Sequence, residues 1–307
     1  MMLRLFLALI LASPTVCAAA QPRLVELSRL VLTDPDPRFG GLSGIELDAD
    51  GTRIAMVGDK GILVTGRLKR QGDRITGAEL HIADLHDKHG KVLKGGFLAD
   101  AEGLAFDGQG GFLVSFEGLH RIKRYAAPDA PSRNGPRCPQ FRRLQKNSGL
   151  EALARAPDGT VYAIPERSGR WKRPFPVYRM RGRRCDARLR IPRRGTFLVT
   201  GADFGPDGML YIVERSFQLI GFATRIRRFA VRGNRIADEE VLMETGHGAI
   251  GNLEGIAVWR DPAGSIRLTL VSDDNFSFFQ RTLLIEFRVD DAPRLRPRPR
   301  PSRSTAD

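Results

Sequence analysis

A unit repeated five times constrains this chain more than its length or composition does. Each copy has an apolar run, a turn rich in glycine or Asp-Gly, and a second apolar run that ends at an acidic residue. The copies begin roughly 50 residues apart, a spacing typical of propeller blades. They are GLSGIELDADGTRIAMVGDKG (41–61), DAEGLAFDGQGGFLVSFEG (100–118), GLEALARAPDGTVYAIPERSG (149–169), TGADFGPDGMLYIVERSF (200–217) and GNLEGIAVWRDPAGSIRLTLVSDDN (251–275).

Further strand-like runs complete each repeat. A third run follows every hairpin, and most copies have a fourth, which in the second copy is QFRRLQ (140–145). The fifth copy lacks a fourth run, whereas a spare run, RLVELSRLVLT (23–33), precedes the first copy. We therefore predict an all-β, five-bladed β-propeller of four-stranded blades, in which the N-terminal strand closes the last blade. Six blades are the alternative if residues 84–99 contain strands.

The two ends of the chain differ from the repeats. Residues 1–20 have Arg4, a short apolar run and a small-residue end at Ala20. This pattern is typical of a secretory signal peptide and predicts a periplasmic or secreted protein. The apolar run is too short to span a bilayer, and no later segment is long and apolar enough to do so. Residues 21–290 are expected to form the propeller, and the Pro/Arg-rich residues 291–307 a disordered tail.

Charge and cysteine content leave alternatives open. The formal net charge is +14, and twelve Arg or Lys residues lie between Arg167 and Arg194 against one Asp. This density indicates attraction for anions, or a solvated outer edge that discourages strand pairing. Cys138 and Cys185 either form a disulfide between neighbouring repeats or remain two thiols.

The repeated acids are predicted to gather at one face of the disc. The innermost strand of a blade is antiparallel to the next one, so the start of the first and the end of the second lie at the same end. The acids therefore form a ring at one mouth of the central channel. Glu102, Glu151 and Glu254 lie at the starts; Asp59, Glu117, Glu166, Glu214, Asp273 and Asp274 lie at the ends.

Such a ring needs positive charge, because unpaired carboxylates repel one another. One source is Ca²⁺, which takes about six to eight oxygen ligands. Neighbouring amides offer further oxygens, on Asn147, Asn252 and Asn275.

Basic side chains beside the ring are the other source. Lys60, Arg167 and Arg215 each directly follow a ring acid, and Arg281 is near. They either form a structural salt-bridge network or bind a phosphate ester, since arginine can bind phosphate through two hydrogen bonds. Lys60, Arg167 and Arg215 are therefore candidate substrate-binding residues.

The copies GLSGIELDADG, DAEGLAFDGQGGFLVSFE, GLEALARAPDGTVYAIPE and NLEGIAVW...LVSDDNF resemble the bacterial family named esterase-like activity of phytase. The resemblance runs from about Phe39 to Val289. It implies an exported propeller, distantly related to calcium-dependent propeller phytases, whose mouth acids bind Ca²⁺ and whose basic residues bind phosphate. By position it implies two sets of metal ligands: Glu102, Glu151 and Glu254, with Glu117, Glu166, Glu214 and Asp273 behind them.

Two copies depart from that pattern. Ser43 replaces the first acid in the first copy, and the fourth copy has only Asp203, out of register. No G-x-S-x-G element marks a serine nucleophile, although Ser43 with a remote histidine is an alternative. His247 lies shortly before the acid of the last copy and is a candidate general acid or base.

The function predicted is metal-assisted hydrolysis of phosphate esters at the channel mouth, with Glu102, Glu254 and His247 as catalytic candidates. The main alternative is a non-catalytic propeller that binds an anionic envelope component or a protein partner. Lactone hydrolysis is a minor alternative. Nucleic acid is not expected as a partner, given the predicted export and 7% aromatic residues. We expect a monomer.

Overall fold

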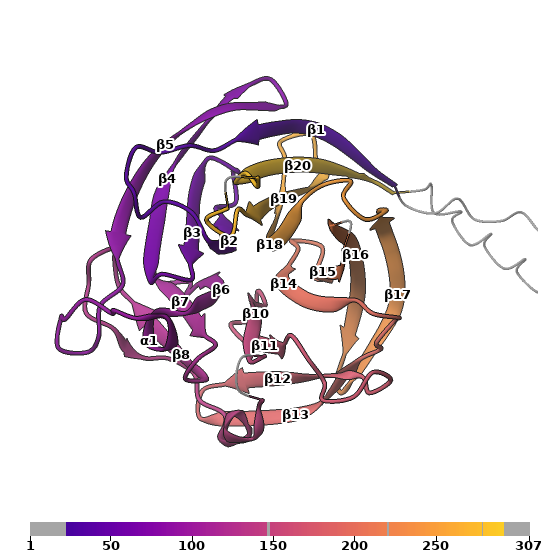
Figure 1. Ribbon diagram of the computed structural model, residues 1–307. Coiled ribbons are helices and arrows are strands. Elements are labelled where there is room, and N and C mark those ends of the chain that lie inside the picture. The colour runs from indigo at the N-terminus through magenta and orange to yellow at the C-terminus, as the bar shows by residue number, and fades with distance from the viewer. Residues whose placement is uncertain (1–22, 146–147, 220, 278, 292–307) are drawn as a thin grey trace, which may run out of the picture.

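The computed structural model describes residues 23–145, 148–219, 221–277 and 279–291. These residues form five antiparallel four-stranded sheets arranged around a central axis (Figure 1). The prediction of a five-bladed propeller is confirmed. The N-terminal strand β1 (Arg23–Val31) pairs with β20 (Leu283–Asp290) and closes the last blade, as expected.

Each blade contains consecutive strands, listed here from the axis outward. Blade 1 has β2 (Leu42–Leu47), β3 (Arg53–Gly58), β4 (Ile62–Gln71) and β5 (Arg74–Asp84); blade 2 has β6 (Ala101–Phe106), β7 (Phe112–Phe116), β8 (Arg121–Tyr125) and β9 (Arg133–Asn134); blade 3 has β10 (Leu150–Arg155), β11 (Val161–Pro165), β12 (Phe175–Arg181) and β13 (Arg184–Ile191); blade 4 has β14 (Leu198–Phe204), β15 (Leu210–Gln218), β16 (Gly221–Arg232) and β17 (Arg235–Glu244); blade 5 has β18 (Asn252–Arg260), β19 (Ile266–Asp273), β20 and β1.

Blade 2 departs from the predicted strand pattern. QFRRLQ was expected to be its outer strand, but residues Pro139–Arg143 form a 3₁₀ helix, and the outer strand is the two-residue β9. Proline lacks a backbone N–H and fits the first turn of a helix better than a ladder. The segment 84–99 contains a one-turn helix, α1 (Gly96–Ala99), and no strand of a sixth blade beyond the end of β5.

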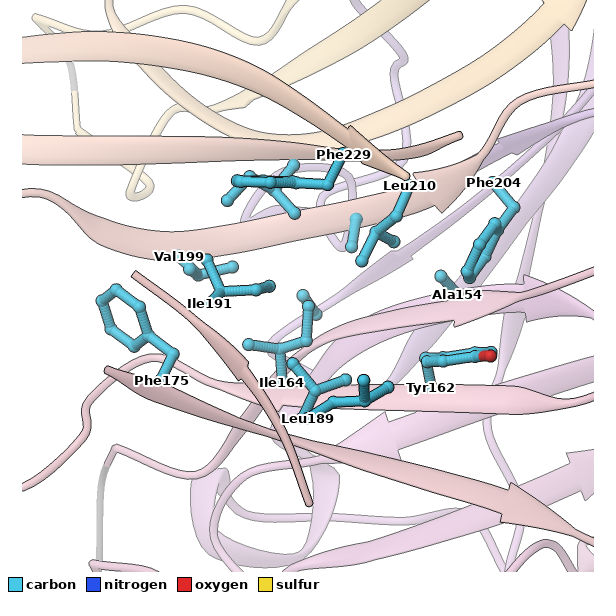
Figure 2. Close-up of a cluster of buried hydrophobic side chains, with 14 of the residues drawn as sticks. Ala154, Tyr162, Ile164, Phe175, Leu189, Ile191, Val199, Phe204, Leu210 and Phe229 are labelled. Carbon is cyan, nitrogen blue, oxygen red and sulfur yellow. The ribbon is translucent and has the colours of Figure 1, made fainter. Parts of the chain in front are cut away.

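Apolar contacts between neighbouring blades form the core. The innermost strands are buried on both faces, as in β2, whereas outer strands such as β17 keep an exposed face. Figure 2 shows the cluster between blades 3 and 4, with Phe175 and Val199 toward one end and Tyr162 and Phe204 at the other. This packing fixes each blade against the next and so sets the positions of the inner strands.

A disulfide joins Cys138, before the 3₁₀ helix of blade 2, to Cys185 on β13 of blade 3. Of the two alternatives for these cysteines, the paired one is therefore present. The predicted signal peptide and most of the predicted tail lie outside the described residues. Within the described residues, no helix has the length and apolar character needed to cross a membrane.

Candidate metal and anion site at the channel mouth

Each innermost strand has a break in its pairing register at the same point. Bulges of this kind re-aim a side chain relative to the regular alternation of a strand. The first residue in each break belongs to an inner ring, and the space on the axis beside these five residues is about 10 Å³, enough for roughly one water molecule. They are Ser43, Glu102, Glu151, Thr200 and Glu254.

The residue after each ring position is small because neighbouring strands approach closely at the axis. A Cβ on Gly103 would lie 2.7 Å from Leu153 Cβ and 2.8 Å from the Glu151 carbonyl oxygen. Gly44, Gly201 and Gly255 meet the carbonyl of a neighbouring ring residue in the same way. The glycine of the repeated E-G-L/I motif is thus explained by packing at the axis.

Gly103→Ala is therefore expected to lower the melting temperature by several degrees. Overpacking of this kind costs about 1–3 kcal/mol, and each kcal/mol is about 2–4 °C in a domain of this size. Gly77→Ala on β5 is the control, since the nearest atom to its added Cβ would be 3.8 Å away. Thermal unfolding that gave the two variants the same melting temperature would contradict the close approach.

A second ring of polar residues lies at the ends of the second strands. Leu42, Ala101, Leu150, Val199 and Leu253 pair with Gly58, Phe116, Pro165, Glu214 and Ser272, so these five pairs are equivalent across the blades. In each blade, the residue that directly follows the second-strand member of the pair in the sequence belongs to the second ring. Its members are Asp59, Glu117, Glu166, Arg215 and Asp273.

Glu214, a predicted metal ligand, falls one residue short of this ring, and Arg215 takes its place. Successive side chains of a strand point to opposite faces, so Glu214 turns into blade 4. There its carboxylate accepts hydrogen bonds from Arg225 (2.8 Å) and Arg227 (2.5 and 2.8 Å), and its side chain is fully buried. Glu214 is therefore not among the acids that the structure brings together at the mouth.

Arg215 neutralises one side of the mouth. It forms ion pairs with Glu254 and, at 3.6 Å, with Glu166, and it donates a 3.0 Å hydrogen bond to Asn252. Asn252 in turn donates to Glu254 at 2.7 Å and to Asp273 at 3.5 Å. Of the two sources of positive charge proposed from the sequence, the basic side chain is therefore present at the mouth in blades 3 to 5.

The opposite side of the mouth has a surplus of carboxylates. Oxygen atoms of Asp100, Glu102 and Glu117 lie within 4.8 Å of one another. Among the ion pairs of the described residues, none involves these three carboxylates. Burial and the neighbouring Glu117 raise the pKa of Asp100 to about 6, and burial, Glu254 and Asp100 raise the pKa of Glu102. Uncompensated negative charge therefore collects in blade 2.

This donor set fits a hard divalent cation. Ca²⁺ prefers carboxylate and carbonyl oxygens, and Asp100, Glu102 and Glu117 supply carboxylates alone. Nearby, Asp59 Oδ1 is buried without a hydrogen-bond partner among the described residues, and burial, Asp273 and Asp100 raise the pKa of Asp59 to about 6. A cation would offset the cost of holding these carboxylates together.

Asp100 was not selected from the sequence. It caps α1 directly before β6 and lies two residues before Glu102. That spacing is the signal that could have identified it, since no other copy has an acid at the equivalent position and the repeat therefore did not mark it.

The basic candidates occupy different environments. Lys60 lies over the Phe276 ring, 2.9 Å from its centroid, and Arg167 donates from Nε to Glu166 at 3.0 Å with its side chain half exposed. Together with Arg215, they line the mouth side of the disc, where strands β3, β11 and β15 end.

The remaining candidates are more scattered. His247 lies on the connection from β17 to β18, and its Nε2 is buried without a partner among the described residues. Asp203 lies deeper in blade 4 and accepts hydrogen bonds from the backbone of Phe204 and Val258 (both 2.6 Å). Asn147 lies outside the described residues. The side-chain amide of Asn275 donates to Gln280, whereas its backbone N–H donates to Asp273 of the second ring at 2.7 Å.

The mouth acids predict how stability depends on pH. Burial raises the pKa of Glu254 from 4.5 to about 7 despite Arg215, and Asp59 and Asp100 rise from 3.8 to about 6. The folded state thus binds these protons more tightly than the unfolded state. The resulting stabilisation is complete below the unfolded pKa values near 4 and is lost as pH rises through about 6 to 7. We expect the melting temperature of calcium-free protein to fall across that window.

Added Ca²⁺ should reverse this trend, because it favours the ionised carboxylates. The check is thermal unfolding across the same pH window with calcium and with chelator. A calcium-free melting temperature that rises through the window would show that the mouth acids do not carry this linkage.

Comparison with known proteins adds a family. A family model described as Phytase-like, esterase-like activity of phytase, matches residues 37–276. No curated protein sequence matches the chain.

Several solved structures are similar over most of the chain. They include the PQQ-bound aldose sugar dehydrogenase from Streptomyces coelicolor (13% identity, 89% of this chain and 100% of that one, TM-score 0.41), a gluconolactonase from Xanthomonas campestris (14%, 90% and 99%, 0.43) and a protein of unknown function from Dyadobacter fermentans (13%, 88% and 83%, 0.47).

Proposed function

Because this chain belongs to the phytase-like family named esterase-like activity of phytase, we propose that it is a calcium-assisted hydrolase of phosphate esters that acts at the channel mouth. The observation that carries the proposal is the group formed by Asp100, Glu102 and Glu117, three carboxylates within 4.8 Å that have no ion pair among the described residues. These residues would hold the Ca²⁺. The cation, when bound, supplies polarisation of the phosphoryl group and a water of lowered pKa.

The chain's own residues supply the remaining requirements of phosphoryl transfer to water. Arg167 has one nitrogen on Glu166 and a half-exposed guanidinium that can bind phosphate oxygens. Glu254, with a pKa raised to about 7 by burial, can accept the proton of the attacking water near neutral pH. His247, on the connection leading into β18, is the proposed donor of a proton to the leaving oxygen.

The test is phosphate release from a panel of phosphomonoesters, including phytate, with added Ca²⁺ and then with chelator. Calcium-dependent release supports the proposal. Absence of release from every ester, in protein shown to be folded, would refute it and favour a binding propeller whose Arg215 network serves to join blades 3 to 5.

We also propose that residues 1–20 direct export. The support is the pattern of Arg4, the apolar run and Ala18 to Ala20. Amino-terminal sequencing of protein recovered from a bacterial periplasm should begin near Gln21. Intact residues 1–20 on protein recovered from the cytoplasm would contradict export.

A further inference from the structure

A hollow of about 380 Å³ lies beside the mouth, between blades 3 and 4. This volume is within the range of small-molecule pockets. Its walls come from the β11–β12 connection, the segment after β13 and the end of β15. The residues that matter to its chemistry are Arg167, Arg170, Trp171, Arg193, Ser216 and Phe217.

The pocket adjoins the ring of polar residues. Arg167 directly follows Glu166, and Ser216 directly follows Arg215, so two of its walls continue from the second ring. Leu198, which pairs with Arg215, also lines it. A molecule in the pocket could therefore extend one end toward the mouth.

The positive charge in the pocket is only partly neutralised. Arg167 contacts Glu166, but among the described residues neither Arg170 nor Arg193 forms an ion pair with a carboxylate. Arg193 Nε is buried without a hydrogen-bond partner, and Nη1 reaches the Arg170 carbonyl only at 3.4 Å. Arg170 and Arg193 thus line the same pocket, and among the described residues neither guanidinium has a counter-ion, which favours an anion.

The aromatic side chains of the pocket are unusually exposed. Trp171 is 71% exposed and Phe217 67%. Arg193 contacts two rings, with its guanidinium 5.0 Å from the Trp171 ring and 5.5 Å from that of Phe175. Phe175 belongs to the buried cluster between blades 3 and 4 (Figure 2), which anchors this stack. The indole is therefore oriented by Arg193 yet remains accessible to a planar group.

From this juxtaposition of unpaired guanidinium groups with an exposed indole, we propose that the pocket binds phosphomonoesters of aromatic alcohols or nucleosides. The phosphate contacts Arg170 and Arg193, and the planar group stacks on Trp171. This assignment rests on the proposed function in one respect: it takes the ligand of the pocket to be the substrate hydrolysed at the neighbouring mouth. Binding to the pocket itself requires neither metal nor turnover.

Tryptophan fluorescence offers a direct test, because the chain has two tryptophans. Trp259 is 5% exposed and donates from Nε1 to Thr269 Oγ1, so a ligand in solution reaches Trp171 alone. The probe is AMP, added in chelator with excitation at the red edge of indole absorption. We expect saturable quenching by AMP, and at least about tenfold weaker binding of adenosine and of inorganic phosphate.

Variants assign the binding to the pocket. Arg170→Gln and Trp171→Leu are each expected to weaken AMP binding about tenfold, measured by titration calorimetry, because a charge-assisted hydrogen bond and a stacked ring each contribute about 1–3 kcal/mol. Arg183→Gln is the matched control. It removes the same charge from the exposed β12–β13 turn at the opposite face and should leave affinity unchanged.

The results separate this assignment from the proposed function. AMP binding that depends on Arg170 and Trp171, without any phosphate release, supports the pocket and refutes the hydrolase. Calcium-dependent hydrolysis of esters, with AMP affinity equal in Trp171→Leu and wild type, supports the hydrolase and refutes the pocket. Phytate that binds more tightly than AMP through Arg170 but not Trp171 would overturn the aromatic class, since phytate has no planar ring.

Discussion

Replacing Glu102 with glutamine is expected to abolish calcium-dependent phosphate release and also the rise in melting temperature produced by calcium. Glu102 is the member of the blade 2 acid group that lies in the inner ring, and it is surrounded by Asp100, Glu117 and Glu254. Loss of one charged ligand should lower metal affinity, and changes even outside the ligand shell cost about 10- to 100-fold. We therefore expect a fall of at least about 100-fold in kcat/KM at limiting calcium.

The same substitution should stabilise the calcium-free protein at neutral pH, because it removes a buried charge that has no counter-ion. A general structural role for Glu102 predicts the opposite sign. Glu79→Gln makes the same chemical change on the exposed strand β5 and serves as the control for both assays. If Glu102→Gln kept the full calcium-induced shift in melting temperature, the metal site would have to lie elsewhere.

Glu214→Gln is expected to be strongly destabilising, by about 3–5 kcal/mol, although Glu214 takes no part in the mouth. Its carboxylate holds Arg225 and Arg227, and the side chains of Glu214 and Arg227 are fully buried. Arg227 also pairs with Glu239 at 2.7 Å, and Arg194 pairs with Glu239 at 2.8 Å. A neutral amide would leave a buried guanidinium without its main partner.

Chemical denaturation of Glu214→Gln and Glu79→Gln measures this difference. The Glu79–Lys69 pair is exposed on both sides, and loss of such a pair costs about 0–1 kcal/mol. A triple variant with leucine in place of Glu214 and methionine in place of both Arg225 and Arg227 removes all three charges. It should recover much of the stability lost in Glu214→Gln. Equal unfolding free energies for Glu214→Gln and Glu79→Gln would refute the proposed cost of breaking the buried network.

The blade architecture could be predicted because its signals are local. Alternation, Asp-Gly turns and the repeated spacing are properties of neighbouring residues, and closure follows from the spare strand at 23–33 and the missing fifth-copy strand. The prediction failed at QFRRLQ, where Pro139 begins a 3₁₀ helix. An arginine- and glutamine-rich run carries too little periodicity to separate that helix from an outer strand.

By itself, then, the sequence determined the five blades, the closing strand and the gathering of acids at one face. A repeat of antiparallel strands constrains both the number of blades and the end of each blade at which the acids lie. The tertiary structure decided which charges meet. Because the strand register is equivalent in all five blades, Arg215 lies in the ring and Glu214, one residue earlier, turns into blade 4, while Asp100 joins Glu102 and Glu117 without an arginine. It also decided that Cys138 meets Cys185. These outcomes depend on bulges and on contacts between blades, which no local pattern encodes, because a shift of one residue reverses the face to which a strand side chain points.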